Sequence, residues 1–290
     1  MNQHYTYHVY YYECLTGAEE TKDSIRISNR LLTDAVYAPG GEEIPFTKES
    51  FLMKTRYPGA VIGLGADHDA GGSSEVDIKN KKEAVKGGIT LDYVTGLPYW
   101  PGSSVKGTIR SAFETKVKGS YLVKEMLEGH FGEKISDELY NSLVEEIFGS
   151  GLGAKKRHGN VGAKQRGEDI FLDAVVVNPD SQGKVLGFDN VTSHKLTKKD
   201  KIGMDEPNPV QLFKILPGVT FLFRFDLKDS EVYKKLTQEV KLELYQAILE
   251  TTGMGAKTNT GYGSVEVVDH SGAGTWQELI AVNRTPAEGR

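Results

Sequence analysis

Two segments of the chain combine glycine residues with hydroxyl-bearing and cationic side chains, in patterns suited to holding an anion. In the first, Ser103 and Ser104 stand directly before an apolar run, and Lys106 and Arg110 follow one turn apart. Serine side chains satisfy the free N–H groups of a first helical turn, and a helix N-terminus near cations favours a phosphate. An ordinary helix start with solvated charges explains this stretch about equally well. Trp100, just upstream, either stacks on a base or anchors the strand end in the core, and we favour the anchor.

The second segment, residues 253–263, is rich in glycine. It is not a P-loop, because no glycine stands before Lys257, and Thr258 replaces the third glycine of a dinucleotide fingerprint. Glycines let backbone N–H groups approach a ligand, and an aromatic ring offers a stacking surface. Because no acid–base pair accompanies the loop, a phosphodiester backbone fits it better than a small metabolite. The candidate ligand-binding residues here are Gly255, Lys257, Thr258, Asn259, Gly261, Tyr262 and Gly263.

A third stretch, residues 151–167, concentrates positive charge in an acidic chain. It holds five cationic residues and no acidic residue, whereas the whole chain of 290 residues carries a net charge of -5. Its glycines predict a flexible loop. The functional interpretation is an arm that follows phosphates, and the alternative is a solvated surface loop. The candidate residues are Lys155, Lys156, Arg157, Lys164 and Arg166.

Other chemistry is weakly represented. In a strand, Asp67-His68-Asp69 would send neighbouring side chains to opposite faces, so we expect no metal site and no cofactor. A single cysteine, Cys14, excludes an internal disulfide framework and a cysteine-based zinc site. The first residues lack the pattern of a secretory signal, and no apolar run is long enough to cross a membrane. We therefore expect a cytoplasmic protein.

Hydrophobic patterns predict the elements that position these residues. Strands are expected at 60–65, 89–94, 169–177, 219–227 and 264–268, and helices from Val105, around 121–127, from Ser136, and after Asp229-Ser230. A strand at 4–15 and a short helix at 31–36 are also predicted. The principal elements give the order β-α-β-β-α-β. The predicted class is α+β, with a ferredoxin-like or RRM-like antiparallel sheet. Residues 1–268 form one domain with insertions at 66–88, 119–167 and 178–211, followed by a tail at 269–290.

These segments resemble a known family. Leu97–Gly107 resembles the helix-start motif of CRISPR-associated RAMP proteins, and Gly253–Gly263 resembles their C-terminal glycine-rich loop. Tyr57-Pro58-Gly59 and Glu206-Pro207-Asn208-Pro209 narrow the resemblance to the RAMP subunit numbered six of the type III-B (Cmr) effector complex. The resemblance covers about residues 55–268.

The resemblance implies a non-catalytic backbone subunit of an RNA-guided ribonucleoprotein. Such a subunit would bind CRISPR RNA along its phosphates near the 3′ part of the guide, meet target RNA, and pack beside the repeated Cmr backbone subunit. The insertion at 178–211 would form a thumb between bases of the guide–target duplex. One alternative is an endoribonuclease that processes CRISPR RNA with a histidine, although no histidine lies in the first helix after Ser104. Another is a structural bridge without RNA contact.

Overall fold

The computed structural model describes residues 49–63, 67–69, 84–86, 89–92, 95–117, 119–149, 166–193 and 208–268, together with Asp34. The strands are β1 (Glu49–Thr55), β2 (Asp67–Asp69), β3 (Ala84–Lys86), β4 (Tyr99–Trp100), β5 (Lys116–Val117), β6 (Ser120–Tyr121), β7 (Ile170–Phe171), β8 (Ala174–Asn178), β9 (Leu186–Ser193), β10 (Asn208–Ile215), β11 (Thr220–Asp226) and β12 (Val265–Val267). The helices are α3 (Gly102–Glu114), α4 (Leu122–Phe131), α5 (Asp137–Phe148) and α6 (Gln238–Thr252), with a short 3-10 turn, η1 (Thr258–Thr260).

One antiparallel sheet organises the described chain. Its strand order is β12-β1-β11-β8-β4, and β7 also pairs with β11. The predicted strand at 219–227 is confirmed as β11, and its central place explains why its first four residues are buried, three of them apolar. The protein is therefore a mixed α/β structure built on an antiparallel sheet.

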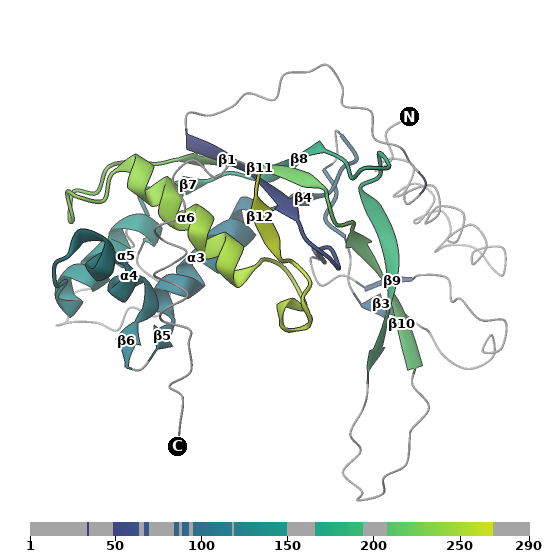
Figure 1. Ribbon diagram of the computed structural model, residues 1–290, viewed down its shortest axis with the longest axis horizontal. Coiled ribbons are helices and arrows are strands. Elements are labelled where there is room, and N and C mark those ends of the chain that lie inside the picture. The colour runs from purple at the N-terminus through teal and green to yellow at the C-terminus, as the bar shows by residue number, and fades with distance from the viewer. Residues whose placement is uncertain are drawn as a thin grey trace, which may run out of the picture.

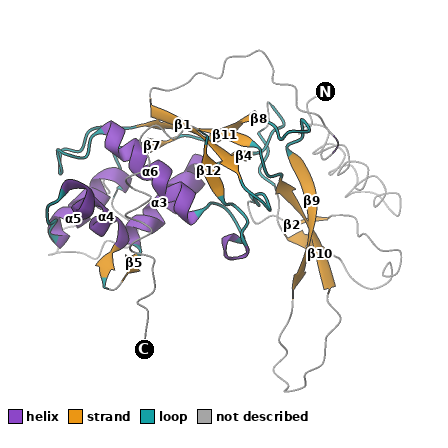
Figure 2. Cartoon of the chain, viewed as in Figure 1, coloured by secondary structure: helices purple, strands orange, loops and turns teal. Residues whose placement is uncertain are grey.

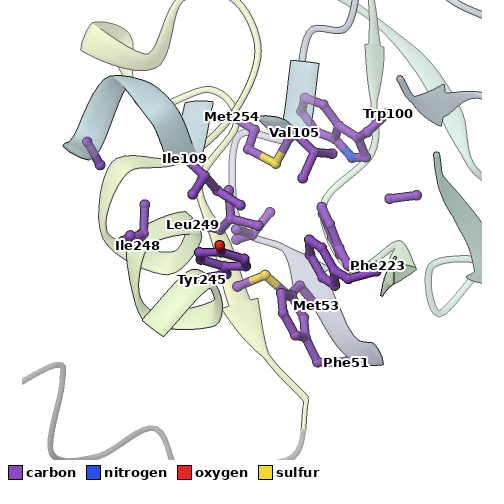
Figure 3. Close-up of a cluster of buried hydrophobic side chains, with 14 of the residues drawn as sticks. Phe51, Met53, Trp100, Val105, Ile109, Phe223, Tyr245, Ile248, Leu249 and Met254 are labelled. Carbon is purple, nitrogen blue, oxygen red and sulfur yellow. The ribbon is translucent and has the colours of Figure 1, made fainter. Parts of the chain in front are cut away.

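The helices gather on one side of this sheet, while the hairpin of β9 and β10 projects from the opposite end (Figure 1). Figure 2 shows the same separation of helices from the hairpin. The core lies between sheet and helices. Val105, Ile109 and Phe113 of α3 are buried at the spacing that the sequence predicts for one helix face. They meet buried side chains of α6, β1 and β11 in a single cluster (Figure 3).

Aromatic rings fill much of this core. The ring of Phe51 stacks on Phe223 with centroids 5.5 Å apart, and these residues are paired across β1 and β11. Trp100 is completely buried, and its ring lies edge-on to Phe221 at 6.1 Å. Trp100 therefore anchors β4 in the core, which confirms the favoured interpretation of this residue over stacking on a base.

The two inserted helices agree closely with their sequence signals. Helix α5 starts after Ser136, whose hydroxyl oxygen accepts a hydrogen bond from the Leu139 N–H at 3.2 Å. It ends at Gly149, which has a positive φ of 85° that suits glycine. Leu143 and Ile147 are buried as the four-residue spacing predicts. The helix predicted around 121–127 is α4, extended to Phe131.

The predicted first strand is wrong in position. Residues 60–65 do not form a strand in their described part, where Ala60 and Val61 make isolated bridges to Ile215 and Ala256. The strand is β1 instead, upstream, where alternate residues are buried. Likewise, the described part of the predicted strand at 89–94 contains a single bridge, from Leu91 to Pro98. In both places a short apolar run was mistaken for a ladder-forming strand.

Two further boundaries differ from prediction. The predicted strand at 169–177 is divided into β7 and β8, although Leu172 between them still donates its N–H to the Arg224 carbonyl of β11 at 3.1 Å. The segment 178–211, expected to be long and irregular, contains most of the β9–β10 hairpin.

Helix α6 begins later than predicted. Its N-cap is Thr237, and Val232 and Leu236 of the predicted apolar face precede the helix. The Ser230 hydroxyl donates instead to Glu146 at 2.5 Å, so this serine holds the preceding loop against α5. Asp229 still contributes at the new start, because its carboxylate accepts the Gln238 N–H at 2.9 Å.

Several predictions fall outside the described residues. These are the strand at 4–15, the tail at 269–290, nearly all of the helix at 31–36, most of the insertion at 66–88, and the basic stretch up to residue 165. Within the described part of the chain, no helix is both long enough and apolar enough to cross a bilayer.

Candidate nucleic-acid interface

The helix start and the glycine-rich loop face each other across one groove. The groove has a volume of about 680 Å³. One wall is the exposed side of α3, the other is the chain from the end of α6 to η1, and Trp100 and Met254 lie at the base. The lining residues are Ile62, Gly63, Trp100, Ser104, Gly107, Thr108, Ser111, Ala112, Thr115, Leu122, Thr252, Gly253, Met254, Gly255, Ala256 and Thr258.

A stripe of small polar residues forms the helical wall. Ser104, Thr108, Ser111 and Thr115 recur at helical spacing along α3 and its C-cap, so they share one face. The Thr108 and Thr115 hydroxyls donate to the carbonyls of Ser104 and Ser111, at 3.0 and 2.7 Å. The two serine hydroxyls have no hydrogen-bond partner among the described residues. The wall is therefore uncharged and offers free hydroxyl groups, a signal that was already visible in the sequence spacing.

Backbone hydrogen bonds within the loop and to residues 59–61 hold the glycine-rich loop in shape. The N–H groups of Ala256, Gly261 and Gly263 donate to the carbonyls of Val61, Thr258 and Gly59, at 2.9 to 3.0 Å. These three N–H groups are consequently not free for a ligand, contrary to the expectation that the glycines expose them.

Two of the loop glycines are required by close packing. Gly263 has a φ of 75°, and a Cβ there would lie 1.7 Å from the Met254 carbonyl oxygen. Gly255 has a φ of 89°, and a Cβ there would lie 2.5 Å from the Val61 oxygen. Any side chain at either position would displace backbone. The glycines thus shape the groove, and side chains must provide most of the ligand contacts.

The tip of the loop carries the exposed donors that the sequence predicts. Lys257, Thr258 and Asn259 are all exposed, and Gly261 closes the tip with a φ of 92°. Lys257 itself adopts a left-handed φ of 61°. No ion pair to the Lys257 ammonium group is found among the described residues. The tip therefore presents one cation and two hydrogen-bonding side chains to solvent.

Tyr262 has a different role from the one predicted. Its side chain is 7% exposed, and its hydroxyl donates to Asp189 Oδ2 at 2.7 Å. Burial, followed by this contact with the carboxylate, raises the pKa of Tyr262 to about 12. The same Asp189 oxygen pairs with Lys214 Nζ at 2.7 Å. A ring buried in this way cannot stack on a base, so the stacking role is contradicted, and Tyr262 instead ties the loop to the β9–β10 hairpin.

The start of α3 already holds an anion from the protein. Its N-cap is Pro101, without a side-chain cap, so the prediction that a serine caps this helix is wrong. The Gly102 N–H donates to Asp173 Oδ1 at 2.7 Å. Ser103 and Ser104 are both exposed, but Ser104 alone of the two lines the groove. A carboxylate thus takes one of the N–H groups that the sequence assigned to a phosphate.

Lys106 and Arg110 lie outside the groove lining, although both belong to α3. Lys106 Nζ lies 5.9 Å from the centre of the Phe171 ring, and Arg110 Nε donates to Glu114 at 2.8 Å. Burial lowers the pKa of Lys106, and the positive charges of Arg110 and Arg166 lower it further. We call Lys106, Arg110 and Arg166 the cationic cluster. The backbone of Arg166 also forms an isolated antiparallel bridge with that of Gly149.

The other four cationic residues of the basic stretch, Lys155, Lys156, Arg157 and Lys164, lie outside the described residues.

The described part of the chain shows no cluster suited to a metal ion. Among these residues, no group of three or more metal-binding side chains converges. Asp69 and its neighbours form β2, whose side chains lie outside the description. The Asp92 carboxylate accepts hydrogen bonds from the N–H and hydroxyl of Thr95, at 2.7 and 2.8 Å, and so stabilises a turn.

The sequence matches the family model of the RAMP superfamily over residues 52–266. The chain belongs to the RAMP superfamily. The match includes both walls of the groove and the β9–β10 hairpin, so the features described above are parts of a RAMP domain.

Named relatives divide into two kinds. The chain is 29% identical over 180 residues to the CRISPR system CMR subunit Cmr6 of Saccharolobus solfataricus, covering 62% of this chain and 48% of the relative. It is 27% identical over 214 residues to Cmr6 of Pyrococcus furiosus, covering 58% and 57%. It is 25% identical over 190 residues to the Cms endoribonuclease Csm3 of Streptococcus thermophilus, covering 63% and 74%. The chain thus spans about half the length of the Cmr6 relatives.

Proposed function

We propose that this RAMP protein is a non-catalytic, RNA-binding backbone subunit of a type III-B (Cmr) RNA-guided effector complex. The observation that carries this proposal is the facing of the helix wall and the glycine-rich loop across one groove. An uncharged groove lined by hydroxyls suits a sugar–phosphate chain read through shape and 2′-hydroxyl groups. Two relatives are named Cmr6, which supports the choice of complex.

The strand order supports a finer view of the fold. Across the sheet the main strands lie in the order β12-β1-β11-β8. In chain order these are the fourth, first, third and second strands of a β-α-β-β-α-β unit. That order supports a ferredoxin-like arrangement with α3 and α6 as its two helices. The β9–β10 hairpin lies between the second and third of these strands, where we expect the thumb that enters the guide–target duplex.

The partners we propose are CRISPR RNA, target RNA and neighbouring Cmr subunits, in the cytoplasm. The groove would hold the 3′ part of the guide, and the cationic cluster would contribute a second, electrostatic contact. Since the phosphate backbone is the same for every guide, binding should be independent of guide sequence.

The second candidate is an endoribonuclease, favoured by the likeness to Csm3. One experiment separates the two functions. The full chain is incubated with guide-length single-stranded RNAs of unrelated sequence, and both binding and cleavage are measured. The proposal predicts salt-sensitive binding of equal strength to all the RNAs, with each RNA left intact. Specific cleavage by the pure protein would establish the enzyme instead, and a lack of binding would support a structural bridge without RNA contact.

A further inference from the structure

Tyr57 is exposed to an unusual degree for an aromatic side chain. It is 84% exposed, and Val268, at 48%, is the other exposed large hydrophobic residue in the described part of the chain. Tyrosine rings usually bury a large area, so a ring standing in solvent is an available contact surface. A single exposed ring is not informative by itself. Its support and its neighbours are what distinguish Tyr57.

The backbone that carries Tyr57 is fixed on both sides. The Arg56 N–H donates to the Ser264 carbonyl, and the Gly263 N–H donates to the Gly59 carbonyl, both at 2.9 Å. The Gly59 N–H closes the turn onto the Arg56 carbonyl at 2.7 Å. The turn is therefore hydrogen-bonded to the end of the glycine-rich loop. A ring on such a support loses little backbone entropy when it binds a ligand.

The neighbouring Arg56 side chain is not available for the same ligand. Its guanidinium pairs with Glu266 at 3.0 Å and with Glu250 at 3.4 Å. These contacts hold the guanidinium of the residue before Tyr57 beside two carboxylates, which offset its charge. The surface at this turn is consequently a planar, uncharged ring rather than a cationic patch.

The loop tip lies directly beside this turn. A Cβ at Gly261 would lie 3.6 Å from Pro58 Cδ, within ordinary contact distance. The tip that Gly261 closes begins at Lys257, whose ammonium group could meet a phosphate next to a base held by the ring. Sites that bind single-stranded nucleic acid combine an aromatic ring for stacking with a cation and polar side chains nearby.

We propose that Tyr57 stacks on a nucleobase of the RNA bound at the glycine-rich loop. Stacking tolerates every base, because each has a π-face, so it fits a protein that accepts any guide. The surroundings favour RNA over a protein partner, because exposed residues 257–261 are polar or glycine, whereas the centre of a protein interface is apolar. This inference rests on the proposed RNA-binding function.

The test compares Tyr57→Ala and Tyr57→Phe with the full wild-type chain. The probe is a single-stranded RNA that contains 2-aminopurine, whose fluorescence falls when the base stacks. Tyr57→Ala should weaken binding by about 5- to 150-fold and abolish part of the quenching, whereas Tyr57→Phe should stay close to wild type. Since no charge is removed, the slope of affinity against salt should not change. Val268→Ala, which trims the other exposed apolar residue, is the control and should bind normally.

Each outcome has a distinct meaning. If wild-type protein binds RNA and Tyr57→Ala binds and quenches equally well, the stacking proposal is wrong while the RNA-binding function stands. If Tyr57→Ala keeps its RNA affinity but fails to join a reconstituted complex, the ring contacts a protein partner and the proposal is also wrong. If the wild-type chain binds no RNA, both the proposed function and this inference fail. Circular dichroism of each variant checks that the fold is retained.

Discussion

The Asp173 carboxylate accepts the backbone N–H of Gly102 at 2.7 Å, joining two residues 71 positions apart. Asp173 lies between β7 and β8, and Gly102 is the first residue of α3. A Cβ at Gly102 would lie 2.1 Å from the Phe171 carbonyl oxygen, so the two segments meet at a position that only glycine allows. The helix start is therefore bound to the sheet before any ligand arrives.

Asp173→Ala should lower the free energy of unfolding by about 1 kcal/mol, the usual cost of losing a cap. Asp173→Asn keeps an oxygen acceptor and loses the charge that favours a helix N-terminus, so its loss should be smaller. Urea denaturation of the wild type and the two variants measures the order of their free energies of unfolding. Equal stability of the alanine variant and wild type would contradict a capping role.

Much of the frame was predictable, and the exceptions have physical causes. The apolar face of α3, the caps of α5 and the long apolar run of β11 are local signals, and each was confirmed. The start of α3 was predicted at Val105 but lies at Gly102, because the carboxylate that holds it comes from a distant part of the chain. The position of β1 was missed, since pairing partners decide which of two apolar runs becomes a strand.

The candidate site divides in the same way. The two motif segments were recognised from composition, and the groove brings them together. Which side chains face the groove depends on how α3 is rotated about its axis. Ser104 lines the groove, whereas Lys106 points toward the Phe171 ring. Tyr262 and Tyr57 could not be ranked from sequence, because burial against Val61 and Leu212 and exposure on a turn are tertiary properties.

A buried ion pair secures the segment that leads into β7. Lys241 Nζ lies 2.8 Å from Asp169 Oδ1, both side chains are almost completely buried, and the Tyr245 hydroxyl donates to Asp169 Oδ2 at 2.7 Å. Lys241→Met leaves the carboxylate buried without its cation and should destabilise the fold by about 3–5 kcal/mol. Adding Asp169→Asn removes the stranded charge, so the double variant should unfold at higher denaturant than Lys241→Met alone. A double variant less stable than either single variant would contradict this account.

Acid should weaken the junction beside Tyr57. Hydrogen bonds from Lys54 and then Arg56 lower the pKa of Glu266. A carboxyl group whose pKa is lowered by folding stabilises the native state above its unfolded pKa, and this stabilisation is lost as pH falls through the folded value. Glu266→Gln should therefore show a flatter loss of stability below about pH 4.5 than wild type. Thermal unfolding at a series of pH values measures both profiles, and parallel profiles would count against the effect.

The cationic cluster should act through charge alone. Combining Lys106→Ala with Arg110→Ala removes two potential phosphate contacts, each worth about 0.7 in the slope of log affinity against log salt. We expect the slope to become less steep by about 1.4 and the affinity to fall equally for unrelated RNA sequences. Lys134→Ala, which removes an exposed cation from the α4–α5 turn, is the matched control. Loss that depends on RNA sequence would refute backbone contact by this cluster.

The groove itself is tested most directly at Gly107. A Cβ added at this position on α3 meets no atom within 4 Å, and Gly107 lines the groove. Gly107→Ala should therefore bind RNA normally. Its free energy of unfolding should rise by about 1 kcal/mol, because alanine favours a helix. Gly107→Leu projects a larger side chain into the groove, and Ser142→Leu, at an exposed position of α5, is its control for added bulk.

The decisive measurement is the RNA affinity of Gly107→Leu beside that of Gly107→Ala, with folding verified for both. Gly107→Leu should lose at least about tenfold in affinity, equivalent to about 1.4 kcal/mol, while Gly107→Ala and Ser142→Leu should match the wild type. Wild-type affinity in a folded Gly107→Leu variant would contradict the claim that the groove between α3 and the glycine-rich loop holds the RNA.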